Sequence, residues 1–141
     1  MTIARIVLSD LHLGARDSLL THVLGGGEIA REPSPVLAAF AAGLRATLGD
    51  REKPQLVLLG DALDLGLSPF GDVSKAFLQL IDAFYPENEQ EIFRRDIVYI
   101  AGNHDHHLWR MAQDRGSISC GRIWAAQAKS AGRPVRSTRP C

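Results

Sequence analysis

The chain has 141 residues, of which 45% are hydrophobic, and its 16 Lys and Arg side chains balance 16 Asp and Glu side chains. This composition is typical of a globular domain and excludes a chain that is disordered throughout. Cys120 and Cys141 are the two cysteines and lack zinc-site spacing, which argues against a disulfide scaffold or a thiolate metal site. Because we find no leader peptide and no apolar run of about 18 residues, we expect a cytoplasmic protein without a membrane span.

The charges are distributed unevenly along the chain. Residues 115–141 contain six basic side chains and no acidic one, whereas residues 1–114 carry a net charge of −6. We therefore expect a folded domain over residues 1–114 and a basic tail over residues 115–141, either disordered or translated outside the native reading frame. The tail could attract nucleic acid electrostatically. Its single aromatic residue, Trp124, provides no stacking pattern, so we do not expect nucleic acid as a partner.

Three short apolar runs rich in branched residues are predicted strands, at residues 3–8, 55–59 and 96–100. They lack strict alternation, which suggests strands that are buried on both faces. Between the first two strands, residues 16–33 are expected to form a surface loop around three consecutive glycines.

Two stretches with helical spacing separate the strands. Ser34 is a predicted N-cap for a first helix, which Pro35 begins and Gly49 ends. Asp72 is a predicted cap for a second helix, which ends before Pro86. A third helix is expected over residues 104–113. Alternating strands and helices predict an α/β fold with a mainly parallel sheet, right-handed crossovers and flanking helices.

Each predicted strand is followed by polar residues of metal-binding type. The three clusters are Asp10 and His12, then Gly60, Asp61 and Asp64, then Gly102, Asn103, His104 and Asp105. Because ligands gather at the carboxyl ends of parallel strands, we expect the clusters to converge on one edge of the sheet. Carboxylate and amide oxygens bind hard cations, and imidazole adds a preference for manganese, iron or zinc. Alternate residues project the same way from a strand end, so Asp10 and His12 could reach one ion, while the carboxylate of Asp61 could bridge two.

In this order, Asp-x-His, Gly-Asp-x-x-Asp and Gly-Asn-His-Asp resemble the first three motifs of the calcineurin-like metallophosphoesterases. The resemblance implies about half of the family's four-layer αββα sandwich. It also implies a two-metal site that hydrolyses small-molecule phosphate esters, with Asp10 and His12 on the first metal, Asp61 on both and Asn103 on the second. His104 would stabilise or protonate the leaving group, Asp105 would orient the ring of His104, and Asp64 would support the site through hydrogen bonds. The two divalent ions are expected to be manganese, with iron, zinc or nickel as alternatives.

The chain departs from the family pattern in its later part. The family's later motifs supply three more imidazole ligands, and no histidine follows His107 here. The resemblance therefore predicts a truncated site of doubtful activity. One alternative is a non-catalytic fragment that binds a metal or a partner protein. Another is that the polar residues serve only as turn or cap residues, and this alternative is strongest for Asp64 and Asp105. Half of a sandwich would also expose an apolar face, which predicts self-association.

Overall fold

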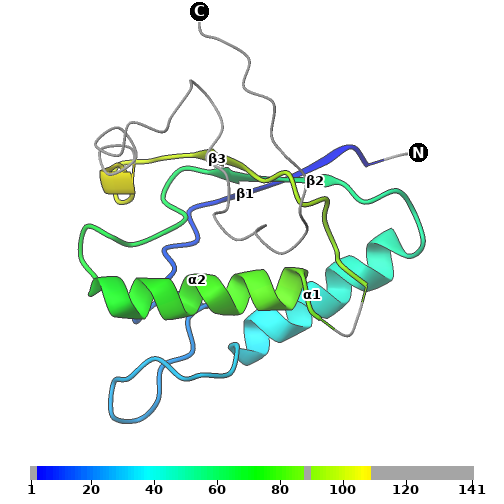
Figure 1. Cartoon of the computed structure of the whole chain (residues 1–141). Helices are drawn as coiled ribbons and strands as arrows, with labels where there is room; N and C mark the ends of the chain where they lie inside the picture. Colours follow the sequence, from blue (N-terminus) through cyan, green and yellow to red (C-terminus); the bar gives the residue numbers. More distant parts are fainter. Residues whose placement is uncertain (1–2, 88–89, 109–141) are drawn as a thin grey trace, which may run out of the picture.

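The structure is a computed structural model that describes residues 3–87 and 90–108. Its elements, in chain order, are β1 (Arg5–Ser9), α1 (Pro35–Leu48), β2 (Gln55–Leu59), α2 (Phe70–Phe84) and β3 (Val98–Ile100) (Figure 1). The strands form one parallel sheet in the order β1-β2-β3. The predicted α/β fold with a parallel sheet and flanking helices is therefore confirmed.

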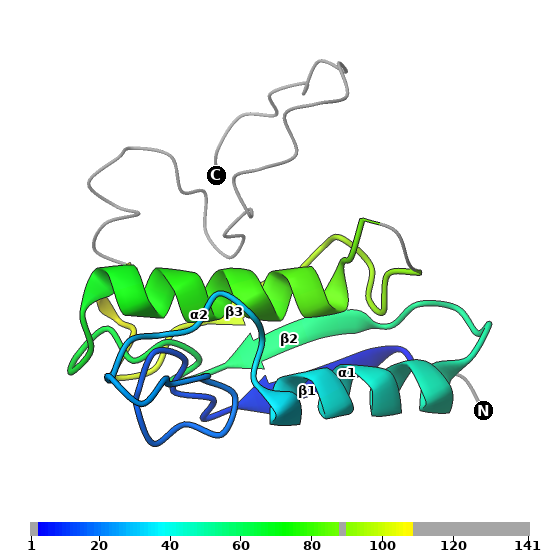
Figure 2. The ribbon, with the colours of Figure 1, turned by 90° about the horizontal axis from the view of Figure 1, so that it is seen from below.

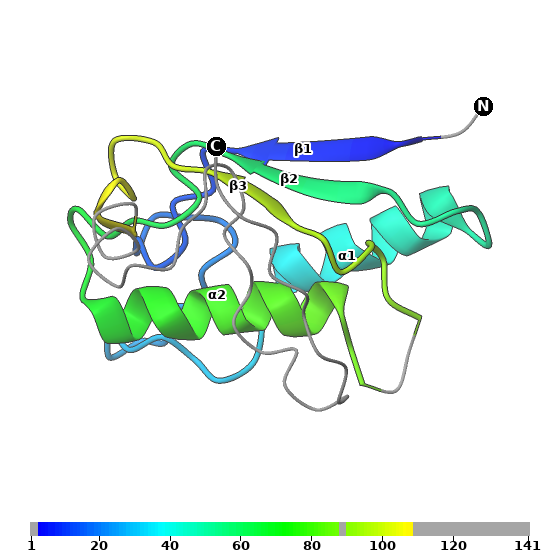
Figure 3. The same cartoon turned by 45° about the horizontal axis from the view of Figure 1, so that its top comes forward.

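Both helices pack against the same face of the sheet, as two views of the ribbon show (Figures 2 and 3). Each strand is added to the sheet on the same side of the strand before it, in the order β1-β2-β3. Because crossover connections between parallel strands are right-handed, both helices then lie on the same face of the sheet. The described residues thus form two layers, one of strands and one of helices.

The core lies between these two layers. Leu56 and Leu58 of β2 point into it and are fully buried. Phe84 of α2 packs edge-on against Phe93, with ring centroids 5.0 Å apart. Phe93 precedes β3 and belongs to no predicted element, yet it is also fully buried.

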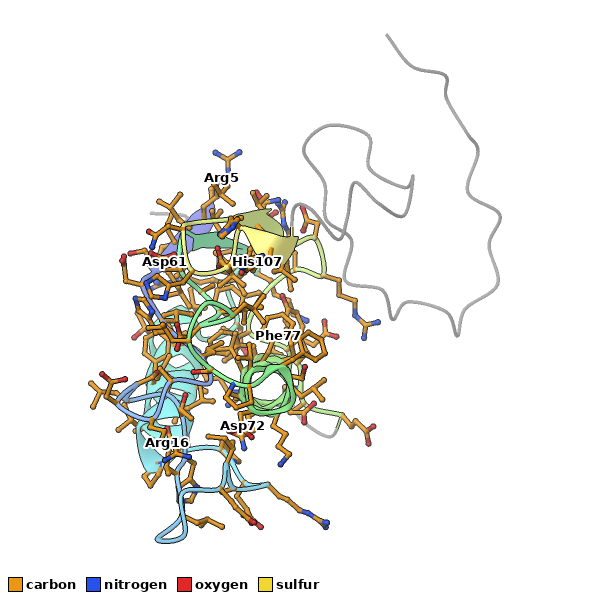
Figure 4. All side chains as sticks on the ribbon, turned by 90° about the vertical axis from the view of Figure 1, so that its left-hand side faces the viewer. Arg5, Arg16, Asp61, Asp72, Phe77 and His107 are labelled. Carbon is orange, nitrogen blue, oxygen red and sulfur yellow. The ribbon has the colours of Figure 1, made fainter. Side chains whose placement is uncertain are left out.

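The other face of the sheet is uncovered by the described residues. Val7, Leu59 and Ile100 face it and are 53%, 43% and 49% exposed. Arg5, labelled in Figure 4, also points away from the helices. The described helices cover one side of the sheet, and the exposure of β1 alternates along the strand, so the expectation that the strands are buried on both faces is wrong for β1. Self-association through the apolar part of this face stays a prediction.

The first helix begins and ends as predicted. Ser34 Oγ accepts a hydrogen bond from the N–H of Leu37 at 3.0 Å, and Gly49 follows the last turn with a positive φ of 54°. The second helix begins earlier than predicted, because the N-cap position is Pro69. Asp72 is not a cap but lies in the first turn, where its negative charge interacts favourably with the helix dipole.

Residues 103–106 form a turn and 107–108 are helical, so the predicted start of the third helix at 104 is wrong, and its predicted continuation to 113 lies outside the described residues. The boundary at residue 114 and the tail over 115–141 also lie outside them.

In the loop over residues 16–33, Val23 and Ile29 form an antiparallel bridge around the exposed Gly25 and Gly26.

Candidate metal centre

The segments that follow the strands are held side by side by backbone hydrogen bonds. The N–H of His12 donates to the carbonyl of Asp61 at 2.9 Å, and the N–H of Gly60 donates to the carbonyl of Ile100 at 2.8 Å. These bonds bring the polar residues after all three strands to the carboxyl edge of the sheet, where Figure 4 labels Asp61 and His107. The predicted convergence of the clusters is therefore present.

Asp10, His12 and Asp61 form one group of potential ligands. Each offers a carboxylate oxygen or an imidazole nitrogen, and these atoms all lie within 4.8 Å of one another. The side chains are exposed or half-buried, so an ion could reach them from solvent. Two carboxylates and one imidazole are a donor set that suits a divalent transition-metal ion.

The backbone at these three residues is unusual. Asp10, His12 and Asp61 have positive φ angles of 54°, 47° and 46°, and they are the non-glycine residues in that region among those described. A left-handed residue of this kind costs on the order of 1–3 kcal/mol, and such residues cluster at functional sites. The strain is thus concentrated on the three residues that form the ligand group.

Gly102 is needed for the close approach of the third segment to the second. A Cβ atom at position 102 would lie 2.3 Å from Asp61 Oδ1 and 2.5 Å from the backbone nitrogen of Asp61. Both distances are far below van der Waals contact, so only glycine allows this packing without a shift.

The third cluster contacts Asp61 through its backbone. The N–H of His104 donates to Asp61 Oδ1 at 2.8 Å, which orients that carboxylate. Asn103 lies in the same turn with an exposed side chain, and its carbonyl accepts a hydrogen bond from Nδ1 of His106 at 2.7 Å. The rings of His106 and His107 stack at a centroid distance of 4.1 Å.

A second group of potential ligands adjoins the first and shares His12 with it. His12, Asp64 and His104 have ligand atoms within 4.8 Å of one another. The rings of His12 and His104 meet edge to face, with centroids 4.8 Å apart. His104 Nδ1 lies 2.7 Å from Asp64 Oδ1, and the Ser68 hydroxyl donates to Asp64 Oδ2 at 2.6 Å.

These contacts shift the pKa values of both partners. Burial alone would raise the pKa of Asp64, but hydrogen bonds from Ser68 and His104 outweigh it and hold that pKa below its ordinary value. The hydrogen bond to Asp64 raises the pKa of His104, with further support from the negative charge of Asp61. Asp64 is therefore a fixed anion against the imidazole.

Residues 4–135 match the family model of the calcineurin-like phosphoesterases. The chain belongs to this family. Comparisons with curated proteins and with solved structures find no match. The family assignment supports metal-dependent hydrolysis of phosphate esters, and Asp10, His12 and Asp61 form a group that could hold a divalent ion in this phosphoesterase.

Asp105 was expected to orient the ring of His104, but in this phosphoesterase its carboxylate makes other contacts. Its fully buried carboxylate accepts hydrogen bonds from the N–H groups of Ala62 and Gly102 and from the hydroxyl of Tyr99. The ring of His104 is instead oriented by Asp64. Asp105 therefore ties the second and third segments together, because a buried carboxylate is satisfied by converging donors.

Two contributors to the site were missed in the sequence. Ser68 and Tyr99 hydrogen-bond Asp64 and Asp105, but neither belongs to a motif. Burial and the bond to Asp105 raise the pKa of Tyr99, so its hydroxyl stays protonated and donates. The spacing of Ser68 four residues after Asp64 is the one available signal, and it is common by chance.

Within the part of the chain that the structure describes, no helix combines the length and the apolar composition needed to cross a membrane.

Proposed function

We propose that this chain hydrolyses phosphate esters through a two-metal site at the carboxyl edge of the sheet. The observation that carries the proposal is the convergence of Asp10, His12 and Asp61 on one point, each in the left-handed backbone region. Asp10 and His12 would hold the first ion, Asp61 would contribute to both ions, and Asn103 would hold the second. When bound, such ions activate water and neutralise charge on the phosphoryl group.

His104 is the proposed general acid for the leaving group. Its Nδ1 faces the buried carboxylate of Asp64, so Nδ1 carries a proton and Nε2 is the nitrogen left to act on substrate. Asp64 supports this role rather than binding an ion, since His104 and Ser68 already engage its two oxygens. A positioned acid of this kind contributes typically about 10²- to 10⁴-fold to a rate.

The ligand types favour manganese as the metal, with iron, zinc or nickel as alternatives. Among the described residues the second ion has only Asp61 and Asn103 as proposed ligands, so water, His106, His107 or another chain would complete its shell. We therefore expect this chain alone to have low activity. A cytoplasmic location and small-molecule substrates belong to the same proposal, and a non-catalytic metal-binding role is its alternative.

The test is hydrolysis of bis(p-nitrophenyl) phosphate by the purified full chain with added Mn²⁺. We expect slow turnover that requires Mn²⁺ and that Asp61→Asn abolishes. Asp82→Asn is the matched control, because Asp82 is an exposed carboxylate of α2 and belongs to neither ligand group. Folded protein without turnover would favour the non-catalytic alternative, which Mn²⁺ binding lost in Asp61→Asn but kept in Asp82→Asn would then support.

A further inference from the structure

A cleft of about 640 Å³ opens beside the candidate metal centre. Its lining includes Asp10, His12, Asp64 and His104, which belong to the two ligand groups. The other lining residues come mainly from the segment that follows β1 and from the first turns of α1. Its volume lies within the range of about 300–1,000 Å³ that is typical of small-molecule sites.

The lining of the cleft away from the ligand groups is mainly apolar. It includes Leu11, Leu19, Leu20, Val36, Phe40 and Leu67. Three of these side chains are unusually exposed for their type, with Leu19 75%, Val36 46% and Leu67 81% exposed. Exposed apolar side chains that gather in one concave site indicate binding of an apolar ligand rather than ordinary surface scatter.

The charges along the cleft also restrict what it can hold. The described residues that line it include no Lys or Arg, and Asp17 is the charged side chain outside the ligand groups. A nucleic-acid backbone or a polyphosphate would meet a carboxylate there instead of a cation. An uncharged group attached to a single phosphate avoids that repulsion.

We propose that the cleft binds the apolar alcohol portion of a phosphate ester whose phosphate lies at the metal centre. This inference rests on the proposed function, because the metal centre positions the phosphate. The continuity of the cleft with His12, Asp64 and His104 allows one molecule to occupy both parts. The substrate class is therefore a phosphate ester with an alkyl or other apolar chain.

The experiment measures binding of butyl, hexyl and octyl phosphate to the full chain with Mn²⁺, by calorimetry below their micelle-forming concentrations. We expect affinity to rise with chain length, by up to about fourfold for each methylene that is fully buried. Inorganic phosphate is the probe for the metal centre alone. Equal affinity for butyl and octyl phosphate would overturn the proposal.

Variants at exposed positions test where the chains bind. Leu19→Gln combined with Leu67→Gln should flatten the dependence on chain length and leave inorganic phosphate binding unchanged. Leu24→Gln is the matched control, because Leu24 lies in the same loop, is 47% exposed and does not line the cleft. A double variant with the wild-type dependence would also overturn the proposal.

The two proposals fail in different ways. Mn²⁺-dependent hydrolysis of bis(p-nitrophenyl) phosphate without any effect of chain length on binding would refute the cleft and keep the hydrolase. A chain-length effect that the double variant removes, in protein without turnover, would support the cleft and count against the hydrolase.

Discussion

Gly102 lies so close to Asp61 that a methyl group at position 102 would overlap the Asp61 carboxylate. We predict that Gly102→Ala displaces Asp61 and lowers Mn²⁺ affinity and turnover at least about tenfold, the scale found when the support of a metal ligand is removed. Mn²⁺ titration by electron paramagnetic resonance measures the affinity directly. Unchanged Mn²⁺ affinity would show that Asp61 is not a ligand or that the segment shifts without cost.

Gly43→Ala is the matched control for this prediction. Gly43 lies inside α1, and a Cβ there would meet nothing within 4 Å. Alanine is favoured over glycine within a helix by roughly 0.5–1 kcal/mol, so this variant should be slightly more stable. Its Mn²⁺ affinity should equal that of the wild type.

Asp64 is expected to act on catalysis through His104. We predict that Asp64→Asn lowers turnover by about 10- to 100-fold while the protein stays folded. The loss of the carboxylate should also reduce the fraction of His104 protonated at Nδ1, which two-bond ¹H–¹⁵N spectra of the imidazole report. An unchanged tautomer in Asp64→Asn would contradict the positioning role, whatever the effect on turnover.

The sequence predicted the location of this site better than its internal contacts. Asp10, His12 and Asp61 were expected to converge because each follows a strand and parallel strands end at the same edge, and their potential ligand atoms lie within 4.8 Å of one another. The partner of His104 was assigned to its chain neighbour Asp105, whereas the structure gives Asp64, 40 residues earlier. Such a pairing depends on how two loops fold over each other, and no local pattern records it.

Asp105 should be essential for stability rather than for chemistry. Asp105→Ala would leave the buried N–H groups of Ala62 and Leu63 and the half-buried donors of Gly102 and Tyr99 without their acceptor. At about 1–3 kcal/mol for each buried donor left unsatisfied, we predict a loss of at least about 3 kcal/mol in the free energy of unfolding. Urea denaturation measures it, and Tyr99→Phe, which removes one donor, should cost clearly less. A loss below about 1 kcal/mol in Asp105→Ala would refute this structural role.

The ion pairs of Glu91 with Arg95 and Lys53 should make the stability of the protein depend on pH. The hydrogen bond from Arg95 lowers the pKa of Glu91, partial burial opposes it, and the hydrogen bond from Lys53 adds to the lowering. Because the folded-state pKa is below the unfolded-state value, this stabilisation is present above the unfolded pKa and is lost as the pH falls through the folded pKa.

We therefore predict that Glu91→Gln is slightly less stable than the wild type at pH 7, with a gap that closes as the pH falls below about 4.5. The effect is small because Arg95 is largely exposed, and added salt should weaken it. Urea titrations at several pH values check this, with Glu52→Gln as an exposed control. A gap that is constant with pH would rule out the ion pairs as its cause.

The elements of the fold were predictable where the local signals were strong. Ser34, Pro35 and Gly49 mark the first helix at both ends, and its bounds were as predicted. The start of α2 was misplaced because Asp72 is equally suited to a cap and to a first turn. Phe93 lies outside every strand and helix, so periodicity gave no reason to place it in the core.

The structure makes Phe93 as important to the core as Phe84. Both rings are fully buried and pack edge to face at 5.0 Å. Removing such a ring leaves a cavity, so Phe93→Ala and Phe84→Ala should each cost about 3–5 kcal/mol in the free energy of unfolding. Phe70→Ala is the control, since Phe70 is 64% exposed and should change stability by less than about 0.5 kcal/mol. If Phe93→Ala behaved like Phe70→Ala in urea denaturation, the segment before β3 would not be part of the core.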